Sequence, residues 1–166
     1  MMKKILLICL SIFCLVGCDY SSKNIAKDKL KGQPVHSYLG GNIELVYAEN
    51  SGGLLSLGND LPNNLRVLIF KIFVTLAMCL LFFYTVLKKG IRKWSLVALI
   101  LIISGGVGNL IDRIMNEGKV VDFIVMSLNN FHTGIFNIAD VYVTIGIIIL
   151  IFSEIVISPT IRRIQT

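Results

Sequence analysis

Apolar runs alternate with short polar or basic segments along the whole sequence. The apolar runs cover residues 5–22, 67–87, 94–111 and 138–161. A helix needs about 20 apolar residues to cross a hydrocarbon core about 30 Å thick, and these runs approach or exceed that length. The pattern therefore predicts an all-α membrane protein with four transmembrane helices.

The first run allows two interpretations. Its charge-free part, residues 5–18, follows Lys3 and Lys4 and is short for a span, as in a cleavable signal peptide. Its end, Leu15-Val-Gly-Cys18, has the form of a bacterial lipobox, in which Cys18 would become the lipidated first residue. Alternatively, the run continues to Ser22 as an uncleaved first span. Taken alone, this stretch favours the lipoprotein interpretation.

A polar segment of about residues 23–65 separates the first two runs. Within it, Ile43, Leu45 and Tyr47 alternate with Glu44, Val46 and Ala48, which indicates a strand, and residues 50–53 have turn composition. Residues 24–31 could form a short interfacial helix. We expect a small extracytoplasmic, β-containing subdomain between the first and second spans.

Basic residues predict the orientation. They gather at residues 3–4, 88–93 and 162–163, which four spans would place on one side of the membrane. The positive-inside rule makes that side cytoplasmic, with both termini inside and residues 19–65 and 112–137 outside. If residues 1–17 were removed as a signal peptide, three spans would remain. The distribution of basic residues alone does not exclude this alternative.

Composition excludes several other classes of protein. Hydrophobic residues make up 55% of the chain and the mean hydropathy is +0.78, far from the balance of a soluble domain. The basic residues behind the net charge of +6 lie between the apolar runs and form no stripe with interleaved aromatic residues. We therefore expect no nucleic-acid partner. The four cysteines form no C-x-x-C pair and have no neighbouring histidine, which indicates small apolar side chains and neither a disulfide framework nor a zinc site.

Three carboxylates, Asp112, Asp122 and Asp140, lie in or beside the ends of apolar runs. An ionisable residue at that depth is a functional-site hypothesis by default. Asp122 has apolar neighbours and no adjacent base, so we expect burial to raise its pKa. Asp140 stands three residues after Asn137, where it could instead serve only as a helix cap.

The third run carries further candidates. Gly105, Gly108, Asn109 and Asp112 share one helical face by their spacing. Asp112 and Arg113 could also form a purely structural ion pair.

Five blocks of sequence, in this order and spacing, resemble the motifs of bacterial lipoprotein signal peptidase, or signal peptidase II. They are Asp19-Tyr-Ser-Ser-Lys23, Asn50-Ser-Gly52, Gly106-Val-Gly-Asn-Leu-Ile-Asp-Arg113, Gly118-Lys-Val-Val-Asp-Phe123 and Phe136-Asn-Ile-Ala-Asp140. The resemblance implies one integral membrane peptidase domain over residues 1–166. It implies a membrane aspartyl endopeptidase of the bacterial inner membrane that cuts diacylglyceryl-modified prolipoproteins just before the lipidated cysteine.

The resemblance also implies roles for individual residues. It makes Asp122 and Asp140 the catalytic pair, with Asp140 the general base and Asp122 the acid by our interpretation. It assigns substrate binding or site architecture to Asn50, Gly52, Asn109, Asp112, Arg113 and Asn137, and a structural role to Asp19 and Lys23. The implied partners are prolipoproteins, membrane lipid and globomycin-type peptide antibiotics. We expect an active site toward the outer face, no metal and no cofactor, and we take a monomer as the default oligomeric state.

The chain departs from the family pattern at one point, since Gly52-Gly-Leu-Leu55 stands where Gly-Ala-Ala-Phe is usual. Because Asp19 to Lys23 belongs to the first block, we interpret the lipobox likeness at Cys18 as coincidental. Two other classes remain as alternatives. A channel or transporter would place charges at the midplane and show an inverted repeat, neither of which we find. A lipidated anchor subunit would carry lipid on Cys18.

Overall fold

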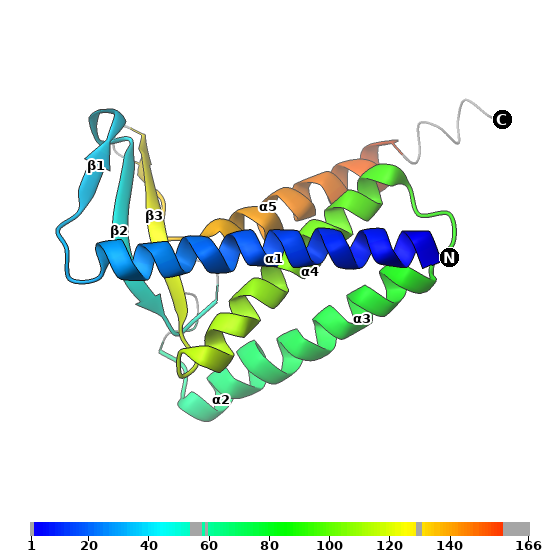
Figure 1. The fold of residues 1–166 in the computed structure, drawn as a ribbon, viewed down its shortest axis with the longest axis horizontal. Coiled ribbons are helices and arrows are strands. Elements are labelled where there is room, and N and C mark those ends of the chain that lie inside the picture. Colours follow the sequence, from blue (N-terminus) through cyan, green and yellow to red (C-terminus); the bar gives the residue numbers. More distant parts are fainter. Residues whose placement is uncertain (1, 54–57, 59, 129–130, 158–166) are drawn as a thin grey trace.

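Long helices form one body and a small sheet caps one end of it, as the computed structural model shows (Figure 1). The structure describes residues 2–53, 58, 60–128 and 131–157. The helical segments are α1 (Met2–Leu30), α2 (Asn63–Val67), η3 (Leu68–Phe73), α3 (Val74–Leu87), α4 (Lys93–Met115), α5 (Ile138–Ile151) and η4 (Phe152–Ile157). The strands are β1 (His36–Tyr38), β2 (Ile43–Asn50), β3 (Val120–Leu128) and β4 (Phe131–His132), with a short helical turn η1 (Leu39–Gly41) after β1.

Three helices are long and apolar enough to cross a membrane: Met2–Leu30, Asn63–Leu87 and Lys93–Met115. Their outer faces carry large apolar side chains, such as Phe13 and Leu80, which are 75% and 71% exposed. Such exposure would be costly in water and is expected in lipid. The protein is therefore a helical membrane-type protein with a small antiparallel sheet.

The first helix is longer than the predicted span over residues 5–22. It continues without a break to Leu30 and absorbs the short helix expected over residues 24–31. It can do so because Asp19 and Lys23, one turn apart, pair at 2.8 Å and are almost fully buried. The helix ends where Gly32 takes a φ of 75°, just before Pro34.

The sheet draws on two distant parts of the chain. Its order is β1-β2-β3-β4 with antiparallel pairing, so β1 and β2 come from between α1 and α2, whereas β3 and β4 come from between α4 and α5. The expected subdomain of residues 23–65 thus contains only half of the sheet. The C-terminal part of α1 packs on this sheet through Ala26 and Leu30, which contact Phe123.

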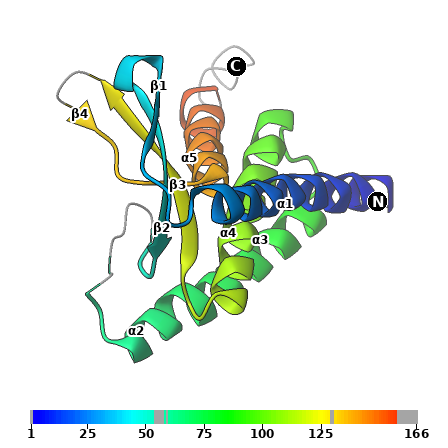
Figure 2. The same ribbon diagram turned by 60° about the vertical axis from the view of Figure 1, so that its left-hand side comes forward.

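Glycine allows α4 and α5 to pack closely. A Cβ atom on Gly105 would clash with the carbonyl oxygen of Ala139, and one on Gly146 would lie 2.9 Å from the carbonyl oxygen of Ala98. Because neither glycine has a side chain, the two backbones approach each other, as small residues permit in membrane helices. This contact fixes the start of α5 beside the middle of α4 (Figure 2).

The helix ends opposite the sheet are tied to one another. Lys4 donates to the carbonyl oxygens of Thr85 and Lys88 at 2.7 and 2.9 Å, and Arg92 donates to that of Ser153 at 2.8 Å. The basic N-terminal residues, the turn between α3 and α4, and the end of α5 therefore lie together, away from the sheet (Figure 1).

Candidate active site

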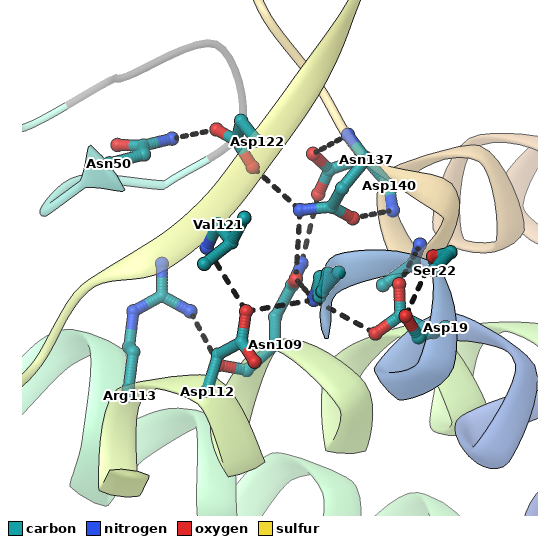
Figure 3. A network of polar contacts seen from close by, with 12 residues as sticks. Asp19, Ser22, Asn50, Asn109, Asp112, Arg113, Val121, Asp122, Asn137 and Asp140 are labelled. Atoms are coloured by element: carbon teal, nitrogen blue, oxygen red, sulfur yellow. Dashed lines mark hydrogen bonds and ion pairs between the residues drawn. The ribbon is translucent and has the colours of Figure 1, made fainter. Parts of the chain in front are cut away.

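The site residues predicted from the sequence gather where β2 and β3 meet the end of α4 and the start of α5 (Figure 3). Hydrogen bonds and ion pairs join them into one polar network at the sheet end of the helices. Its members are Asp19, Lys23, Asn50, Gly52, Asn109, Asp112, Arg113, Asp122, Asn137 and Asp140.

Asp122 lies on β3 and is 2% exposed. Its two carboxylate oxygens accept hydrogen bonds from the side-chain amides of Asn50 at 2.8 Å and Asn137 at 2.6 Å. Burial raises the pKa of Asp122 to about 6; the charge of Asp140 adds to this effect, whereas the two amide donors and Lys23 oppose it. The pKa of Asp122 is therefore raised, as the sequence predicted, and burial is the main cause.

A bulge in the sheet brings Asn50 to Asp122. The pairing of Leu45 with Ile124 and of Ala48 with Asp122 shows one extra residue in β2. Side chains alternate between the two faces of a sheet, so this insertion moves the following residues of β2 to the opposite face. Asn50, paired with Val120, is thereby a diagonal neighbour of Asp122 on the same face.

Asp140 lies in the first turn of α5 and takes part in a capping box. The side chain of Asn137 accepts from the backbone N–H of Asp140 at 3.0 Å, and Asp140 accepts from the backbone N–H of Asn137 at 3.2 Å. The predicted N-cap at Asn137 is confirmed. Asn109 donates to the other oxygen of Asp140 at 2.9 Å, so hydrogen bonds hold both oxygens of this carboxyl group in place.

Both carboxylates line one cavity of about 230 Å³. Phe70, Val74 and Val143 give it apolar walls, and Asn50, Asn109 and Arg113 give it polar ones. Capping alone would not require a second buried carboxylate beside Asp140, so the shared cavity favours a chemical role over the purely capping one.

Lys23 is the cation at the base of the network. Its ammonium lies 2.8 Å from Asp19 and 3.2 Å from Asp112, and donates to Asn109 at 2.9 Å. Asp112 also accepts from the backbone N–H of Val121 at 3.0 Å, which fixes β3 next to Asp122. Lys23 thus connects α1 to the residues that hold both candidate catalytic carboxylates.

The suggested ion pair between Asp112 and Arg113 is wrong. Successive side chains on a helix point about 100° apart, so these two leave α4 in different directions. Asp112 pairs with Lys23, while Arg113 donates to the carbonyl oxygens of Gly52 and Asn109 and lies over the ring of Phe70 at 5.1 Å.

Gly52 and Asn50 form a tight turn after β2. The side chain of Asn50 accepts from the backbone N–H of Gly52 at 2.8 Å and donates to the carbonyl oxygen of Gly53 at 2.9 Å. The predicted turn at residues 50–53 thus also orients the amide that binds Asp122. Leu54 and Leu55, where the sequence departs from the family pattern, lie outside the described residues.

Sequence reasoning missed two features of the site. It did not assign Asp122 to a strand, although residues 120–126 are a run rich in β-branched and apolar residues that follows Gly118. It also did not predict that Lys23 contacts Asn109 and Asp112. These contacts form because α1 packs on α4. Within the described ranges, no three His, Cys, Asp or Glu side chains cluster as metal ligands would.

Comparison with known proteins gives one consistent result. Residues 11–156 match the family described as Signal peptidase (SPase) II. The chain is 34% identical over 150 residues to a lipoprotein signal peptidase of Borrelia hermsii, covering 86% of each protein. It is 31% identical over 152 residues to that of Streptococcus pneumoniae, covering 92% of this chain and 94% of the relative.

Two solved bacterial membrane enzymes have similar structures. One superposes with a TM-score of 0.77 at 26% identity, covering 90% of this chain and 93% of the other. The second gives a TM-score of 0.75 at 25% identity, covering 89% and 86%. Both the helices and the capping sheet therefore belong to a fold already seen in bacterial membrane enzymes.

Proposed function

The chain belongs to the signal peptidase II family of lipoprotein signal peptidases, which remove signal peptides from prolipoproteins, and we propose that Asp122 and Asp140 are its catalytic pair. The observation that carries the proposal is that two carboxylates from separate segments line one cavity, each held by side-chain amides. An aspartyl mechanism needs this arrangement, because two acids sharing a site divide into a proton donor and a base.

Asp140 is the proposed general base. In its carboxylate form it removes a proton from a water molecule, whose oxygen then bonds to the carbonyl carbon of the scissile peptide. The Asn109 amide and the capping box at the start of α5 hold this carboxyl group in place at the cavity.

Asp122 is the proposed acid. Its pKa, raised to about 6, favours a proton that it donates to the carbonyl oxygen as the tetrahedral intermediate forms. The substrate would exclude more water and raise the pKa of Asp122 further. When the intermediate collapses, the amide nitrogen takes the proton held by Asp140, the C–N bond breaks, and Asp122 recovers its proton from the hydroxyl group.

We propose four spans, with α5 and η4 as the fourth. The 14 residues of α5 and the six of η4 form a helix of about 30 Å, enough to cross the hydrocarbon core. The clustered basic residues at the end opposite the sheet support cytoplasmic termini and an active site toward the outer face of the inner membrane. Contacts of Lys4 with the end of α3 support an uncleaved first span.

The proposed substrate is a prolipoprotein that already carries its diacylglyceryl group. The cavity supports this choice because it combines apolar walls, such as Phe70, Val74 and Val143, with polar side chains, which matches a peptide that carries a lipid. Globomycin-type peptides would occupy the same cavity and compete with the substrate. We propose a monomer, since one chain supplies every residue of the network described above.

A gel-shift cleavage assay on a diacylglyceryl-modified prolipoprotein tests the catalytic pair. Asp122→Asn and Asp140→Asn should each lose cleavage while remaining folded, because either change removes a proton acceptor or donor. Asp28→Asn, an identical substitution at an exposed position of α1, should cleave like the unsubstituted protein. Substantial cleavage by either catalytic variant would refute the proposed pair.

A further inference from the structure

A basic pocket of about 240 Å³ lies beside the catalytic cavity. It forms where the first turns of α2 and η3 meet the C-terminal end of α4. Its charged residues are Arg66, Lys71, Arg113, Glu117 and Lys119. The pocket shares Phe70 and Arg113 with the catalytic cavity but contains neither candidate catalytic carboxylate.

Two guanidinium groups in this pocket have unused donors. The Nε atoms of Arg66 and Arg113 are buried, and among the described residues neither has a hydrogen-bond partner. Arg113 is only 5% exposed, so bulk water does not replace the missing acceptor. A buried donor without an acceptor costs free energy, more so when it is charged, and therefore points to an acceptor supplied from outside the chain.

The charge balance of the pocket favours an anionic ligand. Lys119 is paired with Glu49 at 2.8 Å. The remaining cations, Arg66, Lys71 and Arg113, make no salt bridge within the described part of the chain, and Glu117 is the one carboxylate among the described lining residues. An excess of positive charge with free guanidinium donors matches a phosphate group, whose oxygens accept several hydrogen bonds.

The position of the pocket favours a phosphate that belongs to a lipid with acyl chains. It lies at one end of two membrane-length helices, Asn63–Leu87 and Lys93–Met115, where a bilayer places its headgroups. On the same helix, an apolar groove of about 490 Å³ is lined by Leu68, Ile69, Ile72, Phe73 and Leu76. These positions alternate with the helix positions that line the basic pocket, so polar and apolar surfaces adjoin along the same helical segment.

We propose that this pocket binds the phosphate of an anionic membrane phospholipid, with an acyl chain along the apolar groove of η3 and α3. Basic pockets beside membrane helices recognise lipid headgroups in this way. The proposal concerns binding and does not depend on the catalytic pair. Asp122→Asn and Asp140→Asn should therefore retain the lipid even if the proposed mechanism is wrong.

Titration with phosphatidylglycerol tests the proposal. The purified full chain in detergent micelles is titrated with the lipid, and native mass spectrometry measures the bound fraction. Arg66→Gln/Lys71→Gln should weaken binding about tenfold or more, because it removes two of the unpaired cations. Lys88→Gln/Lys89→Gln removes the same charge from exposed positions at the other end of α3 and should bind like the unsubstituted chain. Glu117→Gln should tighten binding severalfold.

Two probes separate the possible sources of affinity. A diacylglycerol with the same acyl chains should bind at least about tenfold more weakly, and millimolar inorganic phosphate should not displace the lipid. Equal binding of the diacylglycerol, or displacement by phosphate, would overturn the phospholipid assignment. So would equal losses in both double variants, which would indicate general attraction to surface charge, or an Arg66→Gln/Lys71→Gln variant that binds normally.

Discussion

Asp19 accepts a hydrogen bond of 2.8 Å from the backbone N–H of Ala139, in the turn of α5 that carries Asp140. This contact connects residues 120 positions apart and uses a donor that the first turn of a helix leaves unpaired. The first helix therefore does more than anchor the protein in the membrane. It positions the start of α5, and through Lys23 it also contacts Asn109 and Asp112 on α4.

Lys23→Met should strongly destabilise the protein. The change leaves Asp19 and Asp112 buried without their cation, and breaking a buried ion pair from one side costs about 3–5 kcal/mol. For a chain of this size, that corresponds to a fall in Tm of roughly 10 °C, measured by thermal unfolding in detergent. Lys27→Met, one turn later and exposed, should leave Tm nearly unchanged. Equal effects at both positions would contradict the buried role of Lys23.

Gly108→Ala should disrupt the contact between α1 and α4. A Cβ atom on Gly108 would lie 2.6 Å from Oδ2 of Asp19, so the carboxylate would have to move from Lys23 and Ala139. Overpacking of this kind costs about 1–3 kcal/mol, and both Tm and cleavage should fall. Gly17→Ala is the matched control, because a Cβ there meets nothing within 4 Å and alanine favours the helix. A harmless Gly108→Ala would show that α1 can shift without cost.

Local patterns were enough to predict the three membrane-length helices, although not the extension of the first one to Leu30, and also the N-cap at Asn137 and the shared face of Gly105, Gly108 and Asn109. These features depend on residues within a few turns, and the structure confirms them. The partner of Asp112 and the contact between Asn50 and Asp122 were beyond such patterns. The first depends on how α1 packs on α4, and the second on a one-residue bulge between strands from distant segments.

Arg113→Lys should reduce kcat/KM by about tenfold or more. The guanidinium donates to the carbonyl oxygens of Gly52 and Asn109 at once, and it thereby holds the turn that orients Asn50 toward Asp122. An ammonium group lacks the planar fork needed for both contacts, and displaced catalytic groups lose rate steeply. Cleavage of a prolipoprotein measures the effect.

The control for this prediction is Arg92→Lys. Arg92 also donates to a backbone carbonyl, that of Ser153, but at the end of the helices away from the site. It should alter Tm at most and leave kcat/KM unchanged. Similar losses of kcat/KM in both variants would mean that Arg113 acts only through general stability.

Asp122→Asn should be more favourable for stability, relative to the unsubstituted protein, at neutral pH than in acid. Because burial raises the pKa of Asp122 from 3.8 to about 6, the folded state binds more protons than the unfolded state between these values. Stability therefore falls as pH rises through that window, by ~3 kcal/mol in total, and is unaffected by this group below it.

Asparagine never ionises and escapes the penalty, although its single carbonyl oxygen leaves either Asn50 or Asn137 without an acceptor. That loss is the same at every pH, so the change in the difference between variant and unsubstituted Tm isolates the carboxylate. Measured at about pH 8 and about pH 4, the difference should shift in favour of Asp122→Asn at the higher pH by roughly 10 °C. A difference that stays constant with pH would mean that Asp122 is ionised in the folded protein throughout this range, and it would remove the basis for assigning Asp122 as the acid.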